Sequence, residues 1–350
     1  MSSLKLIVLS CLLLVGCSSK PRQPSPKIPN EIKVNTVGLK KKLIFNDCVR
    51  GTIKNIQKIE WRGNNYFAVI GQTGVWFLSP IEYQVTRKIE YTDAKGETIW
   101  FGLSPYLIDL DNDGEFEIAQ RGGGYGVIGL LDNTGKRIWE FKPNLLVHPY
   151  KMAVEDLNND KDYEFYVADD GYLYCLNESC KVVWKKPGRY SDIHPITLNG
   201  KRLVITSSKD TFKIWDINGN QIQKIRVNAW ILEFDVIDNA GETFLIRVND
   251  DKLKIFNLTG IKLFEDELPF GLGYHGPQGI IIDSKNSKKK LLAVVTRSST
   301  ATGKALLNIY DVSEWKLVYQ EVLETTEGIN SNNGRLLLGD GKEKLWEYYF

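Results

Sequence analysis

The chain is poor in the residues that most often carry chemistry. Its 350 residues include only three histidines, five cysteines and two methionines, and the formal net charge is +2 at pH 7. A G-x-S-x-G turn, an H-E-x-x-H segment and a Walker loop are all missing from the sequence. It therefore offers none of the familiar motifs of serine hydrolases, zinc peptidases or P-loop enzymes. A near-neutral charge balance also gives no support to a nucleic-acid partner.

The N-terminus has the pattern of an exported protein. An apolar run from Leu6 to Val15 is too short to span a bilayer, but it suits the core of a signal peptide. The run leads into Leu14-Val15-Gly16-Cys17, a tetrad that resembles the lipobox of bacterial lipoproteins. The resemblance implies that residues 1–16 are a signal peptide that is removed and that Cys17 carries acyl chains such as palmitate. An ordinary secretory signal is the alternative. Ser18, rather than an aspartate, follows the cysteine, and this resembles the pattern of lipoproteins that Gram-negative bacteria send to the outer membrane.

The next segment differs in composition from the rest of the chain. Residues 17–40 contain repeated prolines and several basic residues without apolar periodicity. We therefore expect a lipidated cysteine followed by a flexible, extended tether. No second segment of this composition follows, so we expect residues 41–350 to form one domain.

An internal repeat predicts the architecture of that domain. Five segments share an apolar strand, a turn rich in Asp, Asn or Gly, and a second apolar strand, which together indicate hairpins. Their turns lie roughly forty to fifty-five residues apart, as expected for four-stranded propeller blades. The five segments are 127–143, 172–187, 212–227, 253–268 and 306–322.

The blade count follows from the remaining strands. A more divergent unit precedes the five hairpins, which gives six blades, and unused strand-like runs remain at both ends of the domain. We predict an all-β, single propeller of seven four-stranded blades, in which the N-terminal strand at 41–49 completes the last blade. Six or eight blades are the nearest alternatives.

Two repeat families are similar to these hairpins. The hairpin with Asp132, Gly135 and Trp139 resembles the PQQ-like repeat, and Ile214-Trp215-Asp216 resembles a WD repeat. The first resemblance implies that Trp139 packs between neighbouring blades, with Trp184 and Phe264 at matching places. We expect no PQQ cofactor, because the quinone-dependent dehydrogenases have adjacent cysteines and a longer chain.

One acidic segment indicates a metal site. Phe101-Gly102, followed by acidic residues at alternating positions and a glycine, resembles the FG-GAP/VCBS repeat of integrin α-like propellers, whose loop holds calcium. Calcium prefers six to eight oxygen ligands, and a glycine permits the sharp turn of such a loop. The alternative is a solvated turn rich in Asp and Gly. The predicted ligands are Asp109, Asp111, Asp113 and Glu117.

A second loop repeats this spacing less faithfully. Asp156, Asn158, Asp160 and Glu164 stand at the corresponding positions, but Lys161 replaces the glycine. The sequence is compatible both with a second calcium site and with an ordinary turn in this loop.

Cysteines and histidines provide the remaining candidates. Cys175 and Cys180 bracket a hairpin turn, so a disulfide is compatible with an oxidising periplasm, although hairpin geometry restricts it.

His148, His194 and His275 each stand where a new blade begins, from where they can approach the ring axis. Convergence on a metal or proton-transfer site and local packing are the two interpretations.

The sequence thus favours a non-enzymatic binding or scaffold lipoprotein of the bacterial cell envelope, anchored to the outer membrane and stabilised by calcium. Its expected partners are the membrane, through the lipid, and an envelope protein or polysaccharide. In plan it is similar to propeller lipoproteins of the β-barrel assembly machinery, although the acidic loops and blade number differ. The alternative is a polysaccharide-binding protein or a calcium-dependent polysaccharide-active enzyme, with tryptophans such as Trp61, Trp76 and Trp215 as stacking platforms.

Overall fold

The computed structural model describes residues 33–45, 52–91, 103–121, 127–143, 151–156, 160, 162–169, 171–227, 231, 233–239, 242–249, 251–269, 274–283, 290–298, 304–324, 328–341 and 344–349. In these ranges the regular structure consists of antiparallel β-strands. No helix in the described residues is long and apolar enough to cross a membrane.

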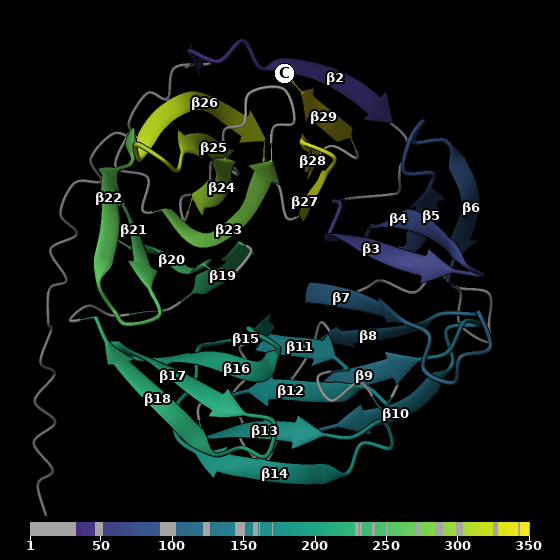
Figure 1. Cartoon of the computed structure of the whole chain (residues 1–350). Coiled ribbons are helices and arrows are strands. Elements are labelled where there is room, and N and C mark those ends of the chain that lie inside the picture. Colours follow the sequence, from purple (N-terminus) through teal and green to yellow (C-terminus); the bar gives the residue numbers. More distant parts are fainter. Residues whose placement is uncertain are drawn as a thin grey trace, which may run out of the picture.

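Seven antiparallel sheets stand around one axis as the blades of a propeller (Figure 1). The prediction of seven four-stranded blades is confirmed. Blade one contains β3 (Asn55–Trp61), β4 (Asn64–Ile70), β5 (Gly74–Leu78) and β6 (Val85–Glu90). Blade two contains β7 (Leu103–Ile108), β8 (Glu117–Arg121), β9 (Ile128–Leu131) and β10 (Arg137–Phe141). Blade three contains β11 (Lys151–Glu155), β12 (Glu164–Ala168), β13 (Tyr172–Leu176) and β14 (Val182–Pro187).

The remaining blades follow in sequence order around the ring. Blade four contains β15 (Asp192–Leu198), β16 (Lys201–Ser208), β17 (Thr211–Asp216) and β18 (Gln221–Arg226). Blade five contains β19 (Phe234–Asn239), β20 (Glu242–Asn249), β21 (Lys252–Asn257) and β22 (Lys262–Glu267). Blade six contains β23 (Tyr274–Asp283), β24 (Lys290–Ser298), β25 (Lys304–Asp311) and β26 (Lys316–Glu324). Blade seven contains β27 (Gly328–Asn332), β28 (Arg335–Gly339), β29 (Leu345–Tyr349) and β2 (Lys40–Phe45).

The N-terminal segment closes the ring. Strand β2 pairs with β29 and so completes the blade that the C-terminal strands begin, as predicted. A further strand, β1 (Lys33–Asn35), pairs with β26 as a fifth strand of blade six. It lies inside the range 17–40 that we expected to be a tether. Because β1 satisfies the backbone groups at the edge of β26, and because Asn35 hydrogen-bonds to the backbone of Leu39, this part of the segment is ordered.

The five predicted hairpins form the third and fourth strands of blades two to six. An Asp or Asn side chain stabilises these turns, because its oxygen accepts hydrogen bonds from backbone N–H groups of the turn. Asp132, for example, accepts from the N–H groups of Thr134 and Lys136. The residue three positions after Asp132 is Gly135, with φ of 80°, and Cys180 adopts φ of 62° at the equivalent place. Cys180 therefore occupies a left-handed position that glycine normally fills.

Aromatic side chains join one blade to the next. Trp139 Nε1 donates to the Glu178 carbonyl of blade three at 2.8 Å, and Trp184 Nε1 donates to the Ile217 carbonyl of blade four at 2.9 Å. Phe264 stacks on Trp315 of blade six with ring centroids 5.4 Å apart. The inter-blade packing implied by the PQQ-like resemblance is thus confirmed at all three positions.

Polar side chains also join one blade to the next near the ring axis, where the first strand of each blade lies (Figure 1). In four blades an Asp or Asn oxygen accepts the N–H of its own next residue, and the same side chain bonds to the first strand of the following blade. The cross-blade bonds are Asn55 Nδ2 to the Pro105 carbonyl, Phe234 N to Asp192 Oδ2, Gly279 N to Asp235 Oδ2, and Asn330 Nδ2 to the Ile56 carbonyl.

Ring closure by β2 is testable by truncation. A chain that begins at Arg50 lacks β1 and β2, exposes the edges of β26 and β29, and loses the packing of Ile44 and Phe45 on the core. We expect the free energy of unfolding to fall by about 4 kcal/mol, and the melting temperature to fall by about 8 °C or more. A chain that begins at Lys33 is the control and should melt with the full-length protein. Equal melting temperatures for the two shortened chains would show that β2 is dispensable.

Candidate functional site

The acidic loop of blade two brings three of its four predicted ligands together. Asp109, Asp111 and Asp113 each place a carboxylate oxygen within 4.8 Å of the others. Local hydrogen bonds shape the loop: the N–H groups of Asp113, Gly114 and Glu115 donate to Asp111, Asp109 and Asp113 respectively. Gly114 has φ of 83°, which fits the sharp turn expected of a glycine here.

The chemistry of these three residues fits calcium. Asp109 Oδ1 is buried and has no hydrogen-bond partner in the described structure. Burial raises the pKa of Asp109, the Gly114 N–H opposes that effect, and the nearby carboxylates of Asp113 and Asp111 raise the pKa further. A hard divalent cation would give the unpartnered oxygen a ligand role and remove the repulsion among the carboxylates.

Glu117, the fourth predicted ligand, is not among the three carboxylates that converge within 4.8 Å. It is the first residue of β8 and is only 7% exposed, and its Oε2 accepts the Leu110 N–H at 2.8 Å. Burial raises its pKa to about 7. Glu117 pairs with Ile108 across the two strands, so its carboxylate reaches the backbone at the base of the loop. Glu117 thus supports the loop through the Leu110 N–H, and its role as a calcium ligand stays a prediction.

Blade one holds the other side of the acidic loop, a contact that the sequence did not reveal. Trp61 Nε1 donates to the Gly114 carbonyl at 2.5 Å, and Arg87 forms an ion pair with Glu115. Arg62 approaches the same carboxylate at 3.7 Å. The loop therefore lies at the junction of blades one and two, where a bound cation would stiffen the contact between them.

The second acidic loop is described only in part. Asp160 Oδ1 accepts the Asp162 N–H at 2.9 Å, as in an ordinary turn, and Glu164 begins β12. Asn158 lies outside the described residues. Over the part of the chain that the structure describes, three converging acidic groups occur at the first loop and not here. A second calcium site at Asp156, Asn158, Asp160 and Glu164 stays a prediction.

The structure does not contain the disulfide that the sequence left open, and Cys175 and Cys180 are free cysteines. Cys175 packs with Tyr166 and Trp215 in the cluster shared with blade four, whereas Cys180 packs with the cluster shared with blade two. The two thiols thus lie on opposite faces of blade three. Burial raises the pKa of Cys175 to about 12, so this thiol is unreactive.

A group of charged residues lies on the first strands near the axis. Asp192 is fully buried, and its Oδ1 lies 3.5 Å from both Lys151 Nζ and His194 Nε2. His194 Nδ1 lies 3.4 Å from Asp235 Oδ1, and the ring packs on Phe234 with centroids 4.6 Å apart. The histidine thus links two carboxylates from blades four and five. His148 and the His275 side chain lie outside the described residues, so convergence of the three histidines stays untested.

The electrostatics of this axial cluster follow from its charges. Burial alone would raise the pKa of Asp192, but Lys151 and His194 lower it to about 2. Burial alone would lower the pKa of His194, but the carboxylates of Asp192 and Asp235 outweigh burial and raise it. The sequence alone did not identify Asp192 and Asp235 as residues near the ring axis. The signal that was present is an Asp or Asn directly before the apolar part of a first strand, as in Asp192-Ile193 and Asp235-Val236.

The tryptophans considered as stacking platforms are packing residues where they are described. Trp76 and Trp215 are buried, and Trp61 packs between Phe77, Arg62 and Arg87. Trp215 also donates to Thr206 Oγ1 within its own blade. These three side chains contribute to the blades and their junctions.

Comparison with known proteins supports the fold. No family model matches the chain, and no curated protein matches it. Among solved structures, it is similar to BBS1N in its complex with ARL6DN, with a TM-score of 0.56, 13% identity, and coverage of 87% of this chain and 95% of that one. The Neurospora crassa Pan2 WD40 domain gives a TM-score of 0.50 at 12% identity, covering 93% and 97%. BamB from Moraxella catarrhalis gives 0.48 at 13% identity, covering 85% and 82%. The protein is a seven-bladed β-propeller.

The axial histidine predicts a pH dependence of stability. The folded pKa of His194 is raised above its ordinary value of 6.5, so its contribution is fully present below that pH and is lost as the pH rises through the folded pKa. We expect the loss of unfolding free energy between pH 6 and pH 9 to be smaller in His194→Gln than in the wild type, as measured by urea unfolding. Glu82→Gln, an exposed carboxylate on blade one, is the control. Parallel pH profiles for the wild type and His194→Gln would contradict the ion-pair role.

Proposed function

We propose that this protein is a lipid-anchored, non-enzymatic scaffold of the bacterial outer membrane that binds an envelope protein, with calcium stiffening its propeller. The anchor is Cys17, in the lipobox-like Val15-Gly16-Cys17 that follows an apolar run of signal-peptide type. The proline-rich residues that follow act as the tether.

One observation carries the scaffold proposal. The first two strands pair with β26 and β29 at the perimeter of the ring, on the outer edges of blades six and seven (Figure 1). A chain anchored upstream of β1 is therefore held by its rim. The loops that connect the strands at both faces of the disc are left to meet a partner, which is the arrangement that a binding platform needs.

The comparison with BBS1N supports a protein as the ligand. That propeller was solved in complex with ARL6DN, so it binds another protein. At 13% identity the likeness concerns the fold, and the carry-over of protein binding to this chain is our proposal.

Calcium has a structural role in this proposal. Asp109, Asp111 and Asp113 would hold the ion, and the loop is already joined to blade one by Trp61 and Arg87. A cation at this position strengthens the junction of two blades and keeps the neighbouring loops in one arrangement.

The calcium site predicts a metal-dependent melting temperature. Calcium at a hundred times its Kd should raise the melting temperature of the chelated protein by about 5 °C, because the ion binds only the folded loop. Asp111→Asn combined with Asp113→Asn removes two exposed ligand carboxylates and should abolish that increase. Glu82→Gln should keep it. An undiminished increase in the double variant would place the calcium elsewhere, and Asp160→Asn would then test the second loop.

The scaffold proposal is tested by crosslinking in native membranes. Lipidated wild-type protein is crosslinked with calcium and with chelator, recovered, and its partners are identified by mass spectrometry. We expect one envelope protein at near-stoichiometric yield in calcium, and a loss of that yield for Cys17→Ser, which cannot be acylated at this position. Recovery of no protein partner in either condition, together with retention of the chain on a glycan array, would replace the scaffold by a polysaccharide-binding function.

A further inference from the structure

Two lysines stand opposite each other on the outer hairpin of blade four. Lys213 of β17 and Lys224 of β18 are paired directly across the two strands. The side chains of such a pair leave the backbone on the same face of the sheet, with their Cβ atoms about 5 Å apart, and like charges at this place repel each other. The pair therefore destabilises the hairpin that carries it.

Neither lysine has an acidic partner. Within the described residues, the two ammonium groups make no hydrogen bond and no ion pair. Lys213 Nζ lies over the rings of Tyr190 and Trp215, at 4.8 Å and 5.9 Å from their centroids. Burial lowers the pKa of Lys213, and the charge of Lys224 lowers it further. Lys213 is half-buried and Lys224 is exposed, so a ligand in solution can reach both.

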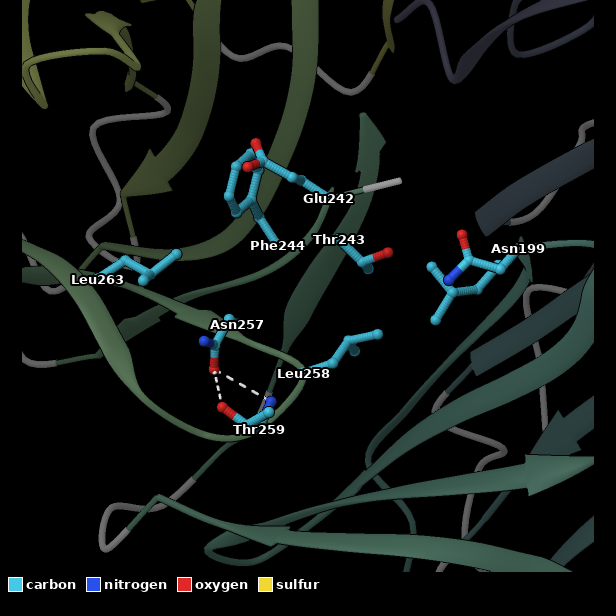
Figure 2. Close-up of a pocket in the computed structure, with 9 residues that line it drawn as sticks. Asn199, Glu242, Thr243, Phe244, Asn257, Leu258, Thr259 and Leu263 are labelled. Carbon is cyan, nitrogen blue, oxygen red and sulfur yellow. Dashed lines mark hydrogen bonds between the residues drawn. The ribbon is translucent and has the colours of Figure 1, made fainter. Parts of the chain in front are cut away.

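The outer hairpin of blade five has the same turn and provides a direct comparison. Figure 2 shows that Asn257 Oδ1 accepts the N–H and the hydroxyl of Thr259. In blade four, Asp216 Oδ1 accepts the N–H of the residue two positions later in the same way. Three positions after these residues, Gly219 has φ of 76° and Gly260 has φ of 83°. The two hairpins can therefore be aligned residue by residue.

Blade five has an ion pair where blade four has two lysines. Counting from the turn, Lys213 corresponds to Lys254. Lys224 corresponds to Glu265, which pairs with Lys254 across β21 and β22. Lys254 Nζ lies 3.8 Å from Glu265 Oε2. The fold thus accommodates opposite charges at this place, and the repulsion in blade four comes from its own sequence.

The surroundings do not supply the missing negative charge. Asp216 accepts hydrogen bonds within its own turn, and Asp210 lies 3.7 Å from Arg226. Strands β14 and β18 contain no Asp or Glu. From blade three, Lys186 reaches the turn of blade four, because its Cε lies 2.7 Å from the position that a Cβ on Gly219 would occupy. The outer strands of blades three and four thus form a positively charged part of the rim.

We propose that Lys213 and Lys224 bind a phosphate group, at a site that does not depend on the scaffold function proposed above. Two ammonium groups supply several N–H donors and two positive charges, which match the oxygens and the charge of a phosphate monoester. Lysine binds phosphate as a point charge, whereas the bidentate recognition of a carboxylate favours arginine. A bound phosphate also offsets the repulsion between the two lysines. Free phosphate and the headgroup of a lipid share this chemistry.

The site is tested with inorganic phosphate, titrated into the full chain labelled with ¹³C at the lysine Cε atoms. We expect saturable NMR shifts at Lys213 and Lys224, with a Kd on the order of a millimolar. The pKa of Lys213 should rise on saturation, because an anion favours the charged form of the ammonium. The same shifts with sodium chloride at matched ionic strength, or an equal Kd for acetate, would overturn the assignment to phosphate.

One substitution separates binding from folding. Lys224→Glu recreates the ion pair of blade five, so it should weaken phosphate binding by at least about tenfold while raising the melting temperature by about 1 °C or more. Lys224→Gln, which removes one charge without adding another, should weaken binding by about fivefold. Lys254→Gln, at the same place in blade five, is the matched control and should bind as the wild type does. Unchanged binding in both Lys224 variants would overturn the proposal.

Vesicles distinguish the two sources of phosphate. The chain with Cys17→Ser, which cannot be acylated at this position, is sedimented with phosphatidylcholine vesicles that contain phosphatidic acid, and with phosphatidylcholine vesicles alone. Recovery that requires phosphatidic acid, and that falls with Lys224→Glu but not with Lys254→Gln, would assign the site to a lipid headgroup. Equal recovery of the two variants, together with the lysine shifts in inorganic phosphate, would assign it to free phosphate. The loss of both signals in the wild type would overturn the proposal.

Discussion

The hydrogen bonds between neighbouring first strands are the interaction on which this ring depends. Among the described strands each blade is a separate sheet, and no backbone ladder joins one blade to the next. Asn55, Asp192, Asp235 and Asn330 bridge these gaps with one side chain each, and every one of them also binds its own following N–H. A side chain fixed to its own backbone loses little additional freedom when it reaches across, which makes such a bridge efficient.

The charged sites of the molecule lie at these junctions between blades. The axial cluster joins blades four and five through Asp192, His194 and Asp235, and the acidic loop joins blades one and two through Trp61 and Glu115. In both places a charged group is held by a neighbouring blade. Protonation at the first site and calcium at the second would therefore change the stiffness of a junction. This arrangement favours a structural use of both charges and fits a rigid platform better than a reaction centre.

The sequence predicts the features of this fold that repeat and misses those that depend on pairing between distant segments. The hairpins and the blade count follow from turn residues and a regular spacing, and the N-terminal strand follows from ring closure. The bond from the Leu110 N–H to Glu117 depends on the pairing of Glu117 with Ile108, which the ligand spacing does not indicate. Cys175 and Cys180 are five positions apart, but strand alternation and the turn put them on opposite faces. The partner of Asp192 is Phe234 of the next blade, which no local pattern indicates.

In the proposed function, the position of the anchor would have a consequence for how a partner is met. The first two strands cover the outer edges of blades six and seven, so the proposed tether would join the disc along that arc of the rim. The inter-strand turns that carry Leu198 and Leu258 belong to blades four and five and not to those outer edges. A partner that docks on such turns would not compete with the anchored segment for backbone groups. Anchoring and recognition would thus use different parts of the same ring, and lengthening or shortening the tether would change the reach of the binding face without changing its shape.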